Sequence, residues 1–377
     1  MKNNEVRIMS FSASDDDVKT IYNELAELAA ASAYKNFGNH GIIEEVTVDN
    51  YAERNEKIKQ AILAYSAQKS GVPTPKTAED LAFAMDNPTF KSIINSINVR
   101  SLYVMLTKYR APQLDRLAEI ETVGLGESRS YEIDTKSLPI AQRATYGSNI
   151  TMVPSYAKSS ITITPKPYSI GISLDIIRMM ANGYDWGFAV ARVYAGMILA
   201  QYKLIVSKIF NTALLNGTPL YQANFSSTTY TQLADDVGML NGGSAEDVMA
   251  LGTRVAWNSI AALATQGGFT TKDEYIRNAY LQKIYGVDSL ILDQFTGLSA
   301  PFNNANAATL RAIPNNLIVL VPSTDKICKL VRESYIRVVE TPANDNTLNR
   351  YEYSYFQSFD AEIATASYFG LQGTTAA

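Results

Sequence analysis

The chain of 377 residues contains a single cysteine, Cys328, and a single histidine, His40. One cysteine excludes an internal disulfide and a thiolate metal cluster, and one histidine excludes the usual multi-histidine metal sites. His40 lies in the glycine-flanked segment NFGNHGII, which we interpret as an ordinary loop. Most proton-shuttling hydrolases need a positioned histidine, so the sequence predicts no catalytic, cofactor-binding or metal-binding residue.

Long apolar runs and clusters of positive charge are also missing. No stretch of about 18 uninterrupted apolar residues is present, so no membrane span is expected, and the first residues lack the apolar core of a secretory signal. Residues 1–95 hold 10 Lys and Arg against 14 Asp and Glu, and residues 96–377 hold 23 of each, so the whole formal charge of -4 lies in the first quarter. A protein that grips nucleic acid through phosphates has a basic surface, and we expect no such grip from residues 1–95.

A content of 46% hydrophobic and 19% charged residues is typical of a globular protein, and the first quarter of the chain has helical patterns. Ser14 and the three aspartates after it suit a helix start, and apolar side chains from Val18 to Leu28 follow at helical spacing. We expect further helices over about 50–69, ending at Gly71, over a short segment ending at DNP, and over about 89–108. The prolines of GVPTPKT make it a linker.

In two segments, SYEIDT and SSITIT, apolar and polar residues alternate as in a β-strand. Tyr131 and Ile133 share one face of the first strand, and Ile161 and Ile163 share one face of the second. The two segments predict a two-stranded ribbon over residues 128–164. Such a ribbon is marginally stable alone in water, so we expect most of its burial to come from other chains.

The tip of this ribbon is expected near Gly147, which is the midpoint between Ile133 and Ile161 and lies in the turn-forming segment TYGSN. Pro139 and Pro154 lie almost symmetrically about it. In TPKPYSIGISLDII the apolar residues move from odd to even positions across Pro165 and Pro167. A shift of one residue reverses the faces of a strand, so the ribbon should bend or bulge there.

The segment from Asp185 to Gly217 predicts one long helix that is apolar on nearly all sides. At about 1.5 Å per residue, residues 188–215 span about 42 Å, which suits a rod on which several elements pack. Its thin polar stripe comprises Arg192, Gly196, Lys203, Ser207 and Asn211.

The remaining third of the chain predicts a mixture of helices and strands. A polar, turn-rich stretch follows Gly217, and helices are expected near 245–265 and 271–285. DSLILD and NLIVLVPS are candidate buried strands, with the loop FNNANAATL between them. YIRVVE, RYEYSYFQ and IATASYFGL are expected as closing strands, the first two joined as a hairpin by TPANDNTLN. GLGESR precedes a strand and lacks a third glycine, so it does not predict a dinucleotide-binding loop.

Four stretches of this sequence resemble the major capsid proteins of tailed bacteriophages, which have the Hong Kong 97-type fold. They are LDRLAEIETVGLGESRSYEID, SSITITPKPYSIGISLDII, the helix ending in TALLNGT, and the closing VRESYIRVV and YFQSFDAEIATASYFGL. The resemblance covers about residues 96–377.

The resemblance implies an α+β fold divided into named parts. Residues 1–95, an N-terminal helical region, fit the family pattern less well, and an arm, an added domain and a scaffold-like segment stay open for them. Residues 96–127 would lead from the arm into the peripheral domain, and 128–164 would be the extended loop. Residues 165–217 would form the peripheral domain with its spine helix, 218–330 the axial domain, and 331–377 the return strands of the peripheral domain, with a hairpin tip at Ala343–Leu348. Expected assembly contacts are Tyr131, Pro139, Tyr146, Gly147, Pro154, Pro165, Pro167, Asn344, Asp345 and Asn346.

The implied function is structural. Many copies of the chain would assemble, in the cytoplasm of a bacterial host, into hexamers and pentamers of an icosahedral virion shell that encloses double-stranded DNA without reading its sequence. Portal, scaffold or decoration proteins are further candidate partners, and neither a cofactor nor a membrane is implied. Two alternatives stay open: an encapsulin-type shell around protein cargo, and a soluble α/β enzyme.

Overall fold

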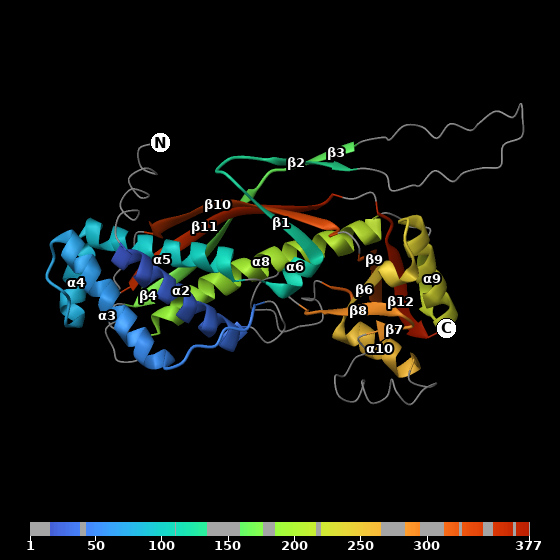
Figure 1. The fold of residues 1–377 in the computed structure, drawn as a ribbon, viewed down its shortest axis with the longest axis horizontal. Helices are drawn as coiled ribbons and strands as arrows, with labels where there is room; N and C mark the ends of the chain where they lie inside the picture. The colour runs from blue at the N-terminus through green and yellow to red at the C-terminus, as the bar shows by residue number, and fades with distance from the viewer. Residues whose placement is uncertain are drawn as a thin grey trace, which may run out of the picture.

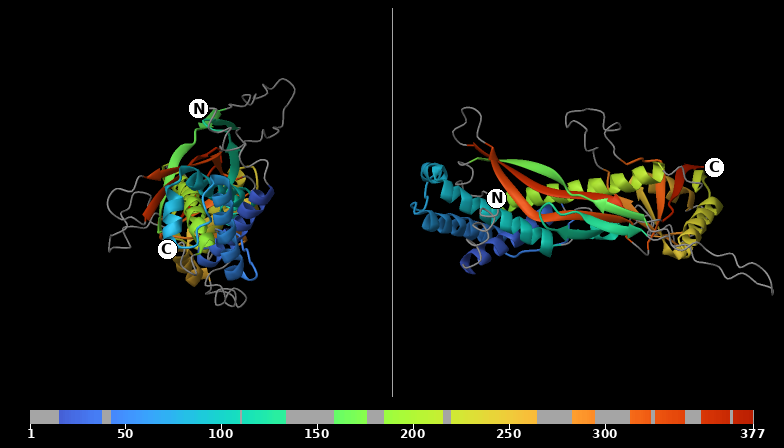
Figure 2. Two further views of the ribbon diagram at one scale, coloured as in Figure 1. Left: turned by 90° about the vertical axis from the view of Figure 1, so that its left-hand side faces the viewer. Right: turned by 90° about the horizontal axis from the view of Figure 1, so that it is seen from above.

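In the computed structural model, helix α8 (Trp186–Leu215) runs along the longest axis of an elongated molecule (Figures 1 and 2). Helices from the first part of the chain lie at one end, and a six-stranded sheet lies at the other. The predicted α+β class is confirmed, and the long helix occupies the predicted segment. The structure describes residues 16–37, 43–109, 111–133, 159–175, 185–215, 220–264, 283–294, 313–323, 326–341, 350–364 and 367–376.

The N-terminal helices agree with the sequence patterns. They are α2 (Asp16–Phe37), α3 (Tyr51–Ser70), α4 (Ala78–Asp86), α5 (Pro88–Lys108) and the short α6 (Pro112–Leu117). Gly71 ends α3 with a φ of 72°, a left-handed conformation that glycine adopts without strain. After the predicted linker, the Thr77 hydroxyl accepts from Asp80 N at 3.1 Å, and Thr77 N donates to the Asp80 carboxylate at 3.0 Å. This capping box starts α4. Ser14, the predicted cap of the first helix, lies outside the described residues.

Helix α2 packs directly along α8. The side chains that it buries are mostly small: Leu25, Leu28, Ala26, Ala29, Ala30 and Ala33 are all 0% exposed. A face of alanines lets two helix backbones approach closely, so α2 forms part of the central core.

The first sheet contains four strands in the order β1 (Ala118–Val123), β10 (Cys328–Thr341), β11 (Arg350–Ile363) and β4 (Lys166–Asp175). Strands β10 and β11 pair antiparallel from Cys328–Ile363 to Thr341–Glu352, which confirms the predicted hairpin. Each strand has 14 residues and is longer than predicted. The turn between them, with Asn344, Asp345 and Asn346, lies outside the described residues.

Strand β4 is the edge of this sheet, and its faces follow the predicted alternation. Tyr168 and Ile170 pack against the main core, whereas Ser169 and Gly171 are exposed. Proline is tolerated at such an edge, where Pro167 lies opposite Ser358. The predicted change of direction at Pro165 is a change of sheet, because the chain leaves the ribbon at Ile163 and enters the first sheet at Lys166.

The second sheet contains six strands in the order β5 (Tyr221–Phe225), β12 (Gly370–Ala376), β9 (Leu317–Pro322), β6 (Val248–Thr253), β8 (Val287–Leu292) and β7 (Lys283–Ile284). Its two faces lie in different apolar clusters. Ala250 and Leu320 pack with helices α9 (Ser227–Leu240) and α10 (Arg254–Ala264), whereas Leu251 and Val319 belong to the main core with α8.

Two expectations for this region were wrong, and a third was wrong at its C-terminal end, while its other residues lie outside the described part. The stretch after Gly217, expected to be turn-rich, contains β5 and α9. The helix expected near 245–265 begins only at Arg254, because a 3-10 turn (Ala245–Asp247) and β6 come first. Of the helix expected over 271–285, residues 283–284 form β7, and residues 265–282 lie outside the described part. A strand that is buried on both faces, such as β6, has no period-2 pattern and resembles a buried helix.

The closing strand was predicted too early and belongs to a different sheet. Ile363 is the last residue of β11, and β12 begins at Gly370. This strand, expected among the return strands, pairs with β5 and β9 of the second sheet instead. The Asn241 side chain holds the approach to it, because its amide donates to Tyr368 O at 3.0 Å and its oxygen accepts from Tyr368 N at 2.9 Å.

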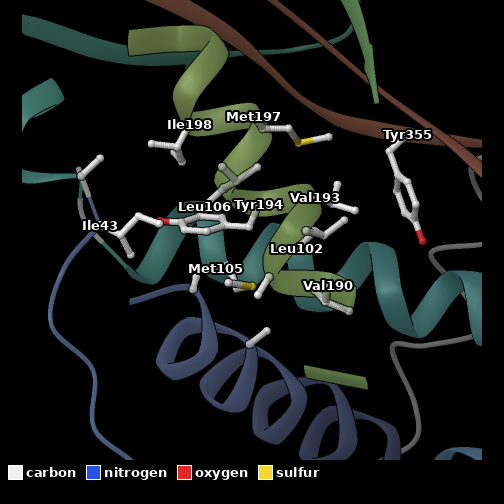
Figure 3. Packing of buried hydrophobic residues seen from close by; sticks show 14 of the residues in the cluster. Ile43, Leu102, Met105, Leu106, Val190, Val193, Tyr194, Met197, Ile198 and Tyr355 are labelled. Carbon is white, nitrogen blue, oxygen red and sulfur yellow. The ribbon is translucent and has the colours of Figure 1, made fainter. Parts of the chain in front are cut away.

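Helix α8 is covered on opposite sides by different elements. Figure 3 shows Tyr194 pointing toward Ile43 and α5, whereas Met197 points toward the side of Tyr355 on β11. By length and composition alone, Trp186–Asn211 could cross a membrane, but 67% of its most apolar window is buried inside the protein. A core helix meets the same criteria, and α8 has its partners within the chain.

The polar stripe of α8 is narrower than predicted. Arg192 and Asn211 are exposed, whereas Lys203 and Ser207 are half-buried. Gly196 is not part of a wet edge, because a Cβ there would lie 2.9 Å from Ile170 Cδ1 of β4. The glycine lets the sheet approach the helix.

Candidate assembly surfaces

The predicted ribbon is present as an antiparallel pair, β2 (Arg129–Ile133) and β3 (Ser159–Ile163). Tyr131 lies opposite Ile161, and Ile133 lies opposite Ser159, so the pairing is symmetric about residue 146 and not about Gly147. The inferred symmetry was therefore wrong by one position. The tip itself lies in residues 134–158, outside the described part.

The two faces of the ribbon differ in chemistry. On one face the hydroxyls of Ser128 and Thr164 lie 3.0 Å apart, and those of Ser130 and Thr162 lie 2.8 Å apart, all exposed. The other face carries Tyr131, half-buried, and Ile163, which is 1% exposed. Only the second face packs on the subunit, and the hydroxyl face is open to water or to a neighbour.

The ribbon stands away from the main body, and its base rests on the first sheet (Figures 1 and 2). Within the described residues its sheet contains only β2 and β3. Arg129 Nε lies 2.9 Å from Glu121 Oε2 of β1, and Lys329 Nζ of β10 lies 5.8 Å from the centre of the Tyr131 ring. Burial and the nearby Glu121 carboxylate raise the pKa of the Tyr131 hydroxyl, so the hydroxyl stays protonated at neutral pH.

A tight turn connects β1 to the ribbon. Glu127 N donates to Gly124 O at 3.2 Å, and Gly126 has a φ of 76°, which is the third position of a type II turn. GLGESR is thus a turn between two strands, in agreement with the rejection of a dinucleotide loop. The Gly126 amide donates to Glu333 Oε1 of β10 at 3.0 Å.

Comparison with known families agrees with this arrangement. A family model described as SPbeta prophage-derived putative capsid protein YonB matches residues 24–372. The chain belongs to this family of capsid proteins. The match includes the N-terminal helices from within α2, the ribbon, α8 and both sheets. None of the curated proteins matches the sequence.

Solved structures similar to this YonB-family protein include capsids of phages and of a GTA particle. The mature capsid of bacteriophage PhiM1 is 10% identical, with 68% of this chain and 85% of that chain covered and a TM-score of 0.43. The capsid of cyanophage P-SCSP1u is 12% identical, with 70% and 88% covered and a TM-score of 0.44. The capsid of a native GTA particle is 11% identical, with 70% and 90% covered and a TM-score of 0.43.

Of the ten predicted assembly contacts, the structure places three. Tyr131 packs within its own subunit at the base of the ribbon, Pro165 is half-buried, and Pro167 is exposed on the edge strand β4. The others lie outside the described residues: Pro139, Tyr146, Gly147, Pro154, Asn344, Asp345 and Asn346. Their role stays a prediction.

Sequence reasoning missed an apolar surface at the end of the second sheet. Met239, Leu240 and Tyr368 are 66%, 38% and 49% exposed, and the hydrogen bonds between Asn241 and Tyr368 place these segments side by side. The signal was an apolar pair at the end of a helix that had not been predicted. In the described part of the chain, no group of three or more His, Cys, Asp or Glu could hold a metal ion.

Proposed function

We propose that this chain is the major capsid subunit of a tailed phage or prophage, with the Hong Kong 97-type architecture. It assembles into hexamers and pentamers of an icosahedral shell around double-stranded DNA. The observation that carries the proposal is the match of the capsid family model over residues 24–372. The order of helices, ribbon, long helix and second sheet supports it.

The ribbon supports a clasp between neighbouring subunits. A two-stranded pair is marginal by itself, and its exposed face carries four hydroxyls that form hydrogen bonds in pairs. We infer that residues 128–164 reach over an adjacent subunit, with contacts near Pro139, Tyr146, Gly147 and Pro154. In the same proposal the hairpin tip with Asn344, Asp345 and Asn346 meets a second neighbour.

The proposed domains follow the same scheme. Residues 165–217 form the peripheral domain with its spine helix, and residues 218–330 form the axial domain. Helices α2, α3 and α5 belong to the wall of the shell, because all three pack on α8. The subunits assemble in the host cytoplasm, with portal, scaffold or decoration proteins as further partners.

Electron microscopy of the expressed protein tests this function. We expect closed, symmetric particles, and a stable monomer at high concentration would overturn the proposal. Particles filled with protein cargo and free of DNA, purified from infected or induced cells, would favour the encapsulin-type alternative.

A further inference from the structure

Three polar side chains of β10, those of Lys329, Arg332 and Glu333, contact the segment that leads to the ribbon. This segment consists of β1 and of the turn between β1 and β2. We propose that these three are positioning residues that set the angle between the ribbon and the body of the subunit, and so determine whether neighbours meet in the geometry that closes a shell. The inference rests on the proposed capsid function.

Lys329 contacts both β1, the strand that precedes the ribbon, and β2, the first strand of the ribbon. It forms an ion pair with Glu119, its partner in the parallel β1–β10 ladder. The same ammonium group lies 5.8 Å from the centre of the Tyr131 ring in β2, within reach of a cation–π contact. One side chain thus links β10, β1 and the base of the ribbon.

Arg332 joins the same strand to the N-terminal helices. Its Nη2 donates to Leu106 O in the last turn of α5 at 3.0 Å, and its Nε donates to Thr122 Oγ1 of β1 at 3.4 Å. Burial lowers the pKa of the guanidinium, which nevertheless stays charged because arginine titrates far above neutral pH. A cation at the C-terminal end of a helix is stabilised by the helix dipole, so the site fixes β1 against α5.

Glu333 holds the turn from which the ribbon starts. Glu333 is only 7% exposed, and its Oε1 accepts a hydrogen bond from the Gly126 amide at 3.0 Å. The register between β10 and β11 shifts between Arg332 and Ile336, so Glu333 lies in an irregular part of the ladder. Such irregularities often re-aim a side chain, and here the side chain points to the β1–β2 turn.

Apolar packing fixes the direction of the ribbon less than these polar contacts do. One face of the ribbon carries hydroxyl groups and one carboxylate, from Ser128, Ser130, Glu132, Ser160 and Thr162. On the other face, Ile163 is the only residue of β2 and β3 that the structure describes as buried. A small rotation about the base would displace everything beyond Ile133 and Ser159, because both strands extend away from the body.

The test replaces Glu333 and follows assembly separately from folding. A hydrogen bond to a charged group is worth at least roughly a factor of ten in an equilibrium. We therefore expect Glu333→Ala to reduce the yield of closed shells of wild-type diameter about tenfold, with open or irregular shells in their place. Glu333→Gln keeps an acceptor for the Gly126 amide and should recover much of the yield. Faster hydrogen exchange in residues 124–127 should accompany the loss.

Asp288→Ala is the control, because it removes a carboxylate of β8 that pairs with Lys283 of β7, and both strands belong to the second sheet. It should assemble as the wild type does. If Glu333→Ala fails to fold, Lys329→Gln provides the same test at a partly exposed position. Normal closed shells from folded Glu333→Ala or Lys329→Gln would overturn this inference. A wild-type protein that forms no particles would instead overturn the proposed function.

Discussion

The indole nitrogen of Trp186 donates to Asn98 Oδ1 at 3.0 Å, and both side chains are buried. Trp186 begins α8 and Asn98 lies in α5. Two further bonds join the same helix end to α3: Tyr51 Oη donates to Asp185 Oδ1 at 2.6 Å, and Gly187 N donates to Asn55 Oδ1 at 3.3 Å. The N-terminal helices are therefore fastened to the long helix by buried hydrogen bonds as well as by apolar packing.

Removal of the Asn98 amide should destabilise the subunit before assembly. Asn98→Ala leaves the buried Trp186 N–H without its acceptor, which typically costs about 1–3 kcal/mol. Denaturant unfolding of the unassembled subunit measures this loss. Asn211→Ala, at an exposed position of α8, should change the free energy of unfolding by less than about 0.5 kcal/mol. Equal effects of the two variants would contradict the assigned role of Asn98.

Truncation of a buried side chain of α8 should destabilise the subunit more than truncation of a half-buried polar side chain of the same helix. Ile198 and Ile205 are 3% and 0% exposed, and a buried isoleucine truncated to alanine typically loses about 2–5 kcal/mol. Lys203→Ala should cost much less, because Lys203 is only half-buried. Thermal melts of Ile198→Ala, Ile205→Ala and Lys203→Ala rank the three. If Lys203→Ala were the most destabilising, our assignment of the helix faces would be wrong.

Replacement by alanine should affect the stability of the subunit differently at two glycines in β-strands, Gly373 and Gly171. A Cβ at Gly373 would lie 1.9 Å from the backbone oxygen of Ala223, so Gly373→Ala must push β12 away from β5 and should cost about 1–3 kcal/mol or more. A Cβ at Gly171 meets nothing within 4 Å. Gly171→Ala should therefore be neutral or slightly stabilising. Urea titrations of both variants decide, and a harmless Gly373→Ala would contradict the pairing of β12 with β5.

Shortening of the ribbon should separate folding from assembly. Deletion of Ser137–Ala157 leaves all described residues in place, so the subunit should remain soluble and folded by circular dichroism. Shell closure should fail because the proposed clasp is lost. Electron micrographs of normal shells from this deletion would show that the ribbon is not a clasp.

Cys328 should be inert in the folded protein. Its side chain is fully buried, and burial, with the nearby Glu362 carboxylate as a smaller cause, raises the pKa of the thiol to about 12. The reactive thiolate is therefore scarce at pH 7 to 9, and maleimide should label the native subunit far more slowly than the unfolded one. Rapid labelling of native protein at neutral pH would contradict the placement of Cys328 in β10.

Much of this fold follows from local patterns in the sequence. Gly71 and the linker after it define the end of α3, because the left-handed conformation and the prolines are local properties. The alternation of Tyr168 and Ile170 with Ser169 and Gly171 identifies β4 in the same way. Each of these elements has one wet face or one clear terminus, and periodicity detects both.

The misses came from residues whose environment is set by distant parts of the chain. Both faces of β6 are buried, so Val248–Thr253 shows no alternation and was interpreted as helix. Ile133 and Ile161 suggested a ribbon register that the pairing of Tyr131 with Ile161 corrects. The positioning residues Lys329, Arg332 and Glu333 were not detected from the sequence. Gly126 lies 207 residues before Glu333, and Thr122 lies 210 residues before Arg332, and the parallel β1–β10 pairing brings them together.

The position of β12 has a consequence for biosynthesis. This strand follows every other described strand along the chain, yet it lies inside the second sheet, between β5 and β9. Until residues 370–376 have been made, β5 and β9 have no neighbour in common and the sheet stays divided. A nascent subunit therefore cannot complete its second sheet before these residues are available to pair with both strands.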